Sequence, residues 1–130
     1  MIAPLLFAAA LGVGAPPPAD DFPARVLQAK LLEAGATGAG YQKKLWAQMT
    51  EPTAGALRRC LAEQAPADKS PFTLVADLAA DGKPARIDVQ PATPVAHCFA
   101  TWFATVILPA PPTVADAKTY SIEIDISITP

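Results

Sequence analysis

The chain has 130 residues, of which 52% are hydrophobic and 17% charged, a size and composition suited to one folded domain and too apolar for a disordered segment. Its formal net charge is -2, and its only adjacent cations are Lys43–Lys44 and Arg58–Arg59. Because nucleic-acid binding needs a basic patch, this charge pattern argues against a nucleic-acid partner.

Residues 1–15 are predicted to be a signal peptide. They form an apolar run that ends in the small residues Val13-Gly14-Ala15, a suitable cleavage triplet, with cleavage after Gly12 or Gly14 as an alternative. The run is shorter than the about 20 apolar residues that span a bilayer, so no stable membrane anchor is expected. No cation precedes the run and Pro16 follows the triplet, so a buried N-terminal helix is the alternative. We expect an exported, periplasmic protein.

Residues 16–23 are predicted to be a Pro-rich linker, and residues 24–52 an N-terminal helical extension of two segments. The first segment, residues 24–34, has an apolar stripe at helical spacing, formed by Val26, Leu27 and Leu31 with the neighbouring Ala29 and Leu32, and glycines stop that pattern. The second segment covers residues 41–49. Pro52 is expected to end it.

The main domain is predicted over residues 53–130. It begins with a helix at 53–64, on which Cys60 lies on the apolar stripe and points inward. Two strands follow, the first over 72–78 and the second with Ala85, Ile87 and Val89 alternating on one face. The Asp81-Gly82 pair between them is typical of a hairpin turn.

The next helix is predicted from Pro94 to about Val106, with Thr93 as its N-cap. Cys98 lies on the apolar stripe of this helix and therefore also points inward, whereas His97 lies on the opposite side. A Pro-rich segment, residues 109–112, ends the helix and turns the chain toward the last strand.

Residues 120–129 alternate strictly between apolar and polar side chains, the pattern of a strand with one dry and one wet face. The dry positions begin Tyr120, Ile122, Ile124, Ile126, and the wet positions begin Ser121, Glu123, Asp125. The element order predicts an α+β fold in which helices are followed by β-β-α-β. The three strands then form an antiparallel sheet of order 2-1-3, with helices packed on one face and the last strand at an edge.

Cys60 and Cys98 are the two cysteines of the chain, and in an exported protein such a pair predicts one disulfide. Both helices that carry them must cover the apolar face of the sheet, which brings the two cysteines together.

From Cys60 to Thr129 the chain resembles the TonB C-terminal-like domains, in particular their cysteine-containing relatives of the AgmX/PglI type. The resemblance is carried by Cys60, by the strand-DG-strand unit FTLVADLAADGKPARIDVQP, by HCFATWFATVILPAPP with its cysteine, and by the closing strand YSIEIDISI. It implies a module that binds extended peptides along an exposed strand. A TonB-type energy transducer also carries a membrane helix and a long spacer, which this sequence replaces with a short leader and linker, so no force transmission is expected.

No catalytic, cofactor or metal site is predicted. His97 and Cys98 point about 100° apart on a helix, so they cannot act as a pair, and the chain contains no second histidine. The carboxylates of Asp77, Asp88, Glu123 and Asp125 are interpreted as a solvated strand face that discourages aggregation. Neither a phosphate-binding loop nor a nucleophile elbow occurs.

The leading hypothesis is a non-enzymatic periplasmic binding or adaptor module. Its partner is an envelope protein or extended peptide that pairs with the edge strand, with these residues as the site: Tyr120, Ser121, Ile122, Glu123, Ile124, Asp125, Ile126. The same edge could instead be covered by the N-terminal helices or form a homodimer. The alternative function is a secreted inhibitor or immunity-type protein that acts on an envelope enzyme through a loop at residues 106–117.

Overall fold

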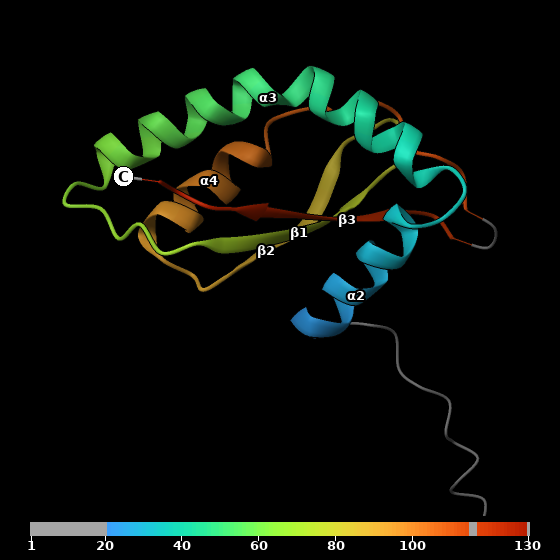
Figure 1. The fold of residues 1–130 in the computed structure, drawn as a ribbon, viewed down its shortest axis with the longest axis horizontal. Helices are drawn as coiled ribbons and strands as arrows, with labels where there is room; N and C mark the ends of the chain where they lie inside the picture. The colour runs from blue at the N-terminus through green and yellow to red at the C-terminus, as the bar shows by residue number, and fades with distance from the viewer. Residues whose placement is uncertain (1–20, 115–116, 130) are drawn as a thin grey trace, which may run out of the picture.

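The computed structural model describes residues 21–114 and 117–129, so the predicted signal peptide and most of the predicted linker lie outside the described residues. The elements in chain order are α2 (Phe22–Glu33), α3 (Gly38–Glu63), β1 (Phe72–Leu78), β2 (Pro84–Gln90), α4 (Pro94–Phe103) and β3 (Tyr120–Ile126). The strands form one antiparallel sheet of order β2-β1-β3 (Figure 1). The predicted α+β fold and its strand order are therefore confirmed.

The core lies between the apolar face of the sheet and the two helices α3 and α4, which cover that face as predicted (Figure 1). Every second residue of β1 and β3 points into it, and α4 adds Val95, Phe99 and Phe103 from its predicted stripe. The sheet contributes these buried apolar residues: Phe72, Leu74, Ala76, Leu78, Tyr120, Ile122, Ile124, Ile126. This packing fixes the register between β1 and β3, because a shift of either strand by one residue would turn its apolar side chains to the polar face.

A disulfide joins Cys60, near the end of α3, to Cys98 in α4. The two Cα atoms are 5.8 Å apart and the residues are 38 positions apart in the sequence. The predicted cross-link between the two helices is therefore confirmed.

The prediction that Pro52 ends a helix is wrong, because α3 continues through Pro52 without a break. The proline ring lies on the exposed side of the helix, while the next residue, Thr53, is buried. A missing backbone N–H on that side is tolerated when the helix bends, and α3 arches over the sheet (Figure 1). The predicted boundary between residues 52 and 53 falls inside this helix, which packs on the core along its length.

The hairpin between β1 and β2 turns at Asp81-Gly82, as predicted. Gly82 has a φ of +89°, and a Cβ there would clash with the carbonyl oxygen of Leu108. The Leu108 N–H also donates to the Gly82 carbonyl oxygen at 3.0 Å. Helix α4 ends at Phe103 rather than at Val106. The segment that follows it is held against the hairpin turn by these contacts.

A bulge interrupts β2, and the simple alternation predicted for this strand is wrong at its beginning. Asp88 pairs with Val75 and Ala85 pairs with Asp77, so β2 has one more residue in this interval than β1. Arg86, within the bulge, has a φ of +51°. The extra residue places Ala85 opposite Asp77 on the polar face, where it is exposed, instead of in the core.

The polar face of the sheet was expected to be open to solvent, but α2 lies across part of it (Figure 1). The helix turns Arg25 and Ala29 toward the sheet and leaves Leu27 and Leu31 59% and 65% exposed. Of the predicted apolar stripe, Ala29 and Leu32 pack on the protein, whereas Leu27 and Leu31 do not. Ion pairs with strand carboxylates, described below, hold the helix in this orientation together with the buried Ala29.

Candidate protein-binding edge

The two edges of the sheet differ in how they are protected. β2, at one edge, begins with Pro84, contains the bulge at Arg86 and is followed by Pro91. Prolines and bulges are features that discourage the addition of another strand. This edge is therefore poorly suited to pair with a partner.

β3, at the other edge, is regular. It pairs with β1 without interruption from Phe72 opposite Ile126 to Leu78 opposite Tyr120, and its sequence YSIEIDI contains neither proline nor glycine. Among residues 21–114 and 117–129, no strand pairs with its outer side. A regular, unblocked edge can accept an extended segment through main-chain hydrogen bonds.

The side chains of the seven predicted site residues are not equally accessible. The four apolar ones are buried under α3 and α4, Ser121 is half-buried, and Glu123 is buried on the polar face. Asp125 is exposed, and so are Ser127 and Thr129 just beyond the strand. The accessible part of the edge is thus its C-terminal part, from Asp125 onward.

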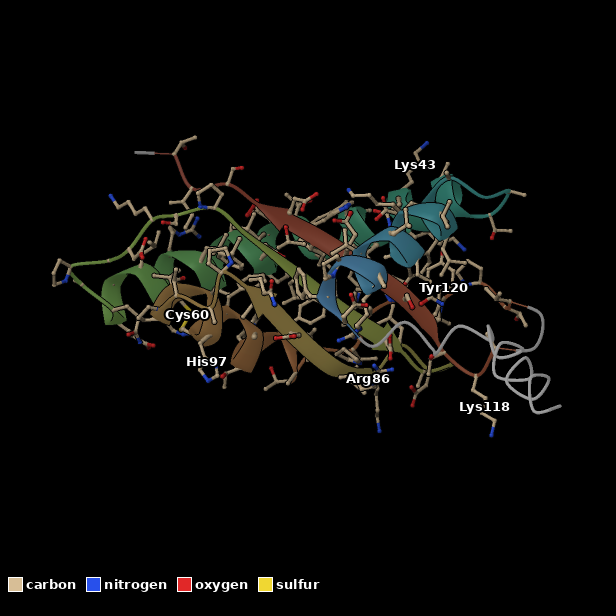
Figure 2. All side chains as sticks on the ribbon, turned by 90° about the horizontal axis from the view of Figure 1, so that it is seen from below. Lys43, Cys60, Arg86, His97, Lys118 and Tyr120 are labelled. Carbon is tan, nitrogen blue, oxygen red and sulfur yellow. A yellow bond between two sulfur atoms is a disulfide. The ribbon has the colours of Figure 1, made fainter. Side chains whose placement is uncertain are left out.

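The N-terminal half of α2 is held over the sheet by a buried arginine. Arg25, 7% exposed, donates to the carbonyl oxygen of Arg86 at 2.6 Å and lies 3.5 Å from a carboxylate oxygen of Asp77. The Arg86 side chain donates to the other oxygen of Asp77 at 2.9 Å. Figure 2 shows Arg86 beside this end of α2. Asp77, expected to be solvated, instead carries a buried charge that two arginines neutralise.

The C-terminal half of α2 is held by Lys30, which lies between two carboxylates of β3. Its Nζ atom is 3.5 Å from Glu123 Oε2 and 3.6 Å from Asp125 Oδ2. Glu123, and then Asp125, raise the pKa of Lys30. Burial disfavours the ionised form of Asp125, but a 2.7 Å hydrogen bond from Thr73 Oγ1 and the charge of Lys30 outweigh it and lower the pKa of Asp125.

Glu123 is the most perturbed carboxyl group of the edge. Burial, reinforced by the neighbouring Glu33 and Asp125, raises the pKa of Glu123 to about 7. Its Oε1 atom is buried and accepts no hydrogen bond from the described part of the chain. Lys30 therefore forms ion pairs with Glu123 and Asp125 on β3 and also interacts electrostatically with Glu33 on α2.

The short connection between α2 and α3, residues 34–37, passes around the β3 edge from the polar face to the apolar face. It lies near the start of β3, because the Tyr41 ring of α3 packs on the Tyr120 ring with centroids 5.4 Å apart. Burial, and to a lesser extent the charge of Glu33 at the end of α2, raises the pKa of Tyr120. Figure 2 shows Tyr120 near this corner. The N-terminal helices thus cover the edge as far as Glu123 and leave it accessible from Asp125 onward.

The histidine and the two cysteines lie apart from this edge. His97 is exposed on α4, near Cys60 and far from α2 in Figure 2, and the disulfide removes both thiols from metal binding or nucleophilic attack. No cluster of three or more His, Cys, Asp or Glu side chains suited to a metal ion occurs in the described ranges. Within those ranges, too, no helix is long and apolar enough to cross a membrane.

A depression lies between the start of α3 and the Pro-rich segment after α4. It measures about 450 Å³ and contains Tyr41 and Lys44. The Tyr41 hydroxyl donates to the Pro109 carbonyl oxygen at 2.7 Å, and burial raises the pKa of Tyr41 to about 12. Among the described residues that line this depression, Lys44 is the charged one.

Sequence reasoning missed Arg25, Lys30 and Glu33, the α2 residues that reach the strands. The available signal was the match between two cations on this helix and the carboxylates at the wet positions of β1 and β3. That signal was hidden by the stronger apolar pattern of Leu27 and Leu31.

Comparison of the chain with models of known families, with curated protein sequences and with solved structures found no match. The resemblance to TonB C-terminal-like domains therefore stays a prediction, and the edge is interpreted from its geometry.

Proposed function

We propose that the protein is a non-enzymatic periplasmic binding or adaptor module that accepts an extended segment of an envelope protein as an added strand on β3. The observation that carries this proposal is the contrast between the two edges of the sheet. Proline and a bulge hinder the addition of a strand to β2, whereas β3 is regular and has no strand partner among the described residues on its outer side.

The rigidity of β3 supports the same function. Its apolar side chains are all buried in the core and its register with β1 is unbroken, so the strand keeps its shape without a partner. A preformed edge loses little conformational entropy when a peptide pairs with it, which favours binding. The resemblance to TonB-like domains, which bind in this way, agrees with the proposal.

The periplasmic location rests on the disulfide and on the predicted signal peptide. A structural disulfide such as Cys60–Cys98 persists in an oxidising compartment and is rare in the reducing cytosol. The proposed partner is accordingly an envelope protein.

Site-specific photocrosslinking in the periplasm tests the proposal. The probe belongs at Ser127, which is exposed beside the free part of the edge, because Glu123 is buried beneath α2. The matched control is the same probe at Gln90, an exposed residue of the guarded β2 edge. We expect one envelope protein to be captured from Ser127 and not from Gln90. Capture from Gln90 alone, or equal capture from both positions, would contradict the proposal.

The alternative of a secreted inhibitor is favoured by one observation on the loop at residues 106–114. Ile107 is 56% exposed, while its carbonyl oxygen accepts a 3.0 Å hydrogen bond from the Gln48 amide. A large apolar side chain displayed on an anchored loop is typical of inhibitor contacts. Replacement of Ile107 by Ser should abolish capture of an envelope hydrolase if this function holds, and leave β3 pairing intact.

A further inference from the structure

The charges around the free part of β3 restrict the partner that can pair there. We propose that the added strand comes from a different protein and alternates basic with apolar residues, so that its lysine or arginine side chains lie on the same sheet face as Glu123 and Asp125. This inference rests on the proposed function and adds the chemistry of the partner to it.

The first argument is the imbalance of charge at the edge. Lys30 is shared between Glu123 and Asp125, at 3.5 and 3.6 Å, and Glu33 lies close enough to influence Glu123. Two carboxyl groups therefore pair with one cation, and a third, that of Glu33, influences it from nearby. The Asp125 side chain is 60% exposed, so a cation of the partner can reach its carboxylate without any movement of the surrounding side chains.

The second argument is the unsatisfied oxygen of Glu123. This residue is 8% exposed, and its Oε1 atom accepts no hydrogen bond from the described residues. Its neighbours are the carboxyl groups of Glu33 and Asp125, which together with burial raise the pKa of Glu123 to about 7. Near neutral pH a proton therefore compensates the crowded carboxyl groups, and a lysine or arginine from an adjacent strand can take over this role.

The spacing of strands makes these contacts geometrically feasible. Directly opposed side chains on neighbouring antiparallel strands have Cβ atoms about 5 Å apart, and basic side chains are long enough to reach diagonal positions as well. The intervening residues of the partner would face the other side of the sheet. There they extend the apolar rim near Ile128, a half-buried residue that packs against the core.

The same charges argue against pairing of two copies of this chain through β3. Two antiparallel β3 strands related by a two-fold axis would place the polar residues of both copies on one face. Glu123 and Asp125 of one copy would then lie beside the same carboxylates of the other, and like charges on adjacent strands are destabilising. A basic strand from another protein avoids this repulsion.

Synthetic peptides provide the test. The probe is a peptide of about seven residues in which valines separate the polar residues threonine, lysine, arginine and threonine, in that order. Its binding to the full chain is measured by isothermal titration calorimetry at low salt. Two matched peptides replace both cations, one with glutamine and one with glutamate. A fourth is the basic peptide with alternate backbone amides N-methylated, which removes the hydrogen bonds needed for strand addition.

We expect the basic peptide to bind about tenfold more tightly than the glutamine peptide, and the glutamate peptide to bind more weakly still. Equal binding of the three unmethylated peptides, with loss on N-methylation, would overturn the inference about charge and leave strand addition standing. Undiminished binding of the N-methylated peptide would contradict strand addition itself. Failure of all four peptides to bind would also overturn the inference.

A charge change in the protein gives an independent check. Ser127→Lys adds a cation at an exposed position next to the strand, where no buried contact is lost. It should reduce the preference for the basic over the glutamine peptide several-fold and leave the far-ultraviolet circular dichroism spectrum unchanged. An unaltered preference in this folded variant would contradict the charge inference.

Discussion

At the scale of single residues, Glu123 links the stability of the edge to pH. Its pKa is about 7 in the folded protein, above the ordinary value of a glutamate, because burial and the carboxyl groups of Glu33 and Asp125 disfavour ionisation while Lys30 only partly compensates. Between its ordinary pKa and about 7 the folded chain holds this proton more tightly than the unfolded chain does. The contribution of Glu123 to stability therefore decreases as pH rises through this interval.

Replacing Glu123 by Gln should remove this pH dependence. We expect the free energy of unfolding of Glu123→Gln, relative to the wild type, to increase between pH 5 and pH 8 by on the order of 1 kcal/mol, a figure reduced for solvent screening. Urea unfolding at the two pH values measures the difference. Asp125→Asn is the matched control and should give little trend of its own between pH 5 and pH 8, because the pKa of Asp125 is lowered from an ordinary value that already lies below this interval. A pH-independent difference for Glu123→Gln would contradict this account.

Arg25 is the residue that fixes the orientation of α2, because it neutralises Asp77 beneath the helix. Arg25→Met keeps much of the side-chain volume but removes the charge and the hydrogen bond to the Arg86 carbonyl oxygen. We expect a loss of about 2 to 3 kcal/mol in unfolding free energy, since a buried charge loses one partner.

Arg58→Met is the control for this variant, since Arg58 is exposed on α3. Its effect should stay within about 0.5 kcal/mol. If the Arg25 and Arg58 variants were equally stable, α2 would not depend on its arginine.

At the scale of elements, the corner between α2 and α3 determines how the chain passes from one face of the sheet to the other. Gly38 begins α3 directly against the end of α2, where a Cβ would clash with the carbonyl oxygens of Leu32 and Glu33. Gly40, two residues later, has no such neighbour. The two glycines lie on the same helix and differ in this close contact, so a substitution at Gly40 is the control for the same substitution at Gly38.

Gly38→Ala should destabilise the protein by about 2 kcal/mol or more, because backbone atoms must move to accommodate the methyl group. Gly40→Ala should instead stabilise it by about 0.5 to 1 kcal/mol, the usual gain from replacing glycine within a helix. Thermal unfolding of the two variants measures both effects. Similar shifts of the midpoint in the same direction would show that the corner is not tight.

Several elements were predictable because local signals agreed with the tertiary structure. Alternation identified β1 and β3, Asp81-Gly82 identified the hairpin turn, and Thr93 caps α4 by accepting a 3.0 Å hydrogen bond from the Ala96 N–H. The continuity of α3 was not predictable from Pro52, since tolerance of that proline depends on which side of the helix faces solvent. Nor does local sequence reveal the extra residue in β2.

At the scale of the whole molecule, the strand order followed from the element order and the handedness of the crossover, and the disulfide followed from the two inward-facing cysteines. The position of α2 did not follow from the sequence, because its buried residues are a charged arginine and a small alanine, Arg25 and Ala29, while Leu27 and Leu31 face solvent. The accessible part of the edge is therefore shorter than the strand that the sequence identifies.

The disulfide is expected to contribute a large share of the stability. It closes a loop of 38 positions, for which the chain-entropy model gives about 4 kcal/mol. The double variant Cys60→Ser, Cys98→Ser should lose about 2 to 4 kcal/mol in unfolding free energy compared with the oxidised protein. Its stability should be unaffected by reductant, whereas reductant should destabilise the wild type. A wild type insensitive to reductant would contradict this role.

Residue-resolved amide hydrogen exchange of the free protein tests the open edge most directly. In an antiparallel strand at an edge, alternate amides point toward the neighbouring strand or away from it. We predict that residues 123–127 show alternating slow and fast exchange, with the fast amides on the side away from β1. Uniformly slow exchange along this segment would show that the edge is already covered, and would contradict the account of β3 as the binding strand.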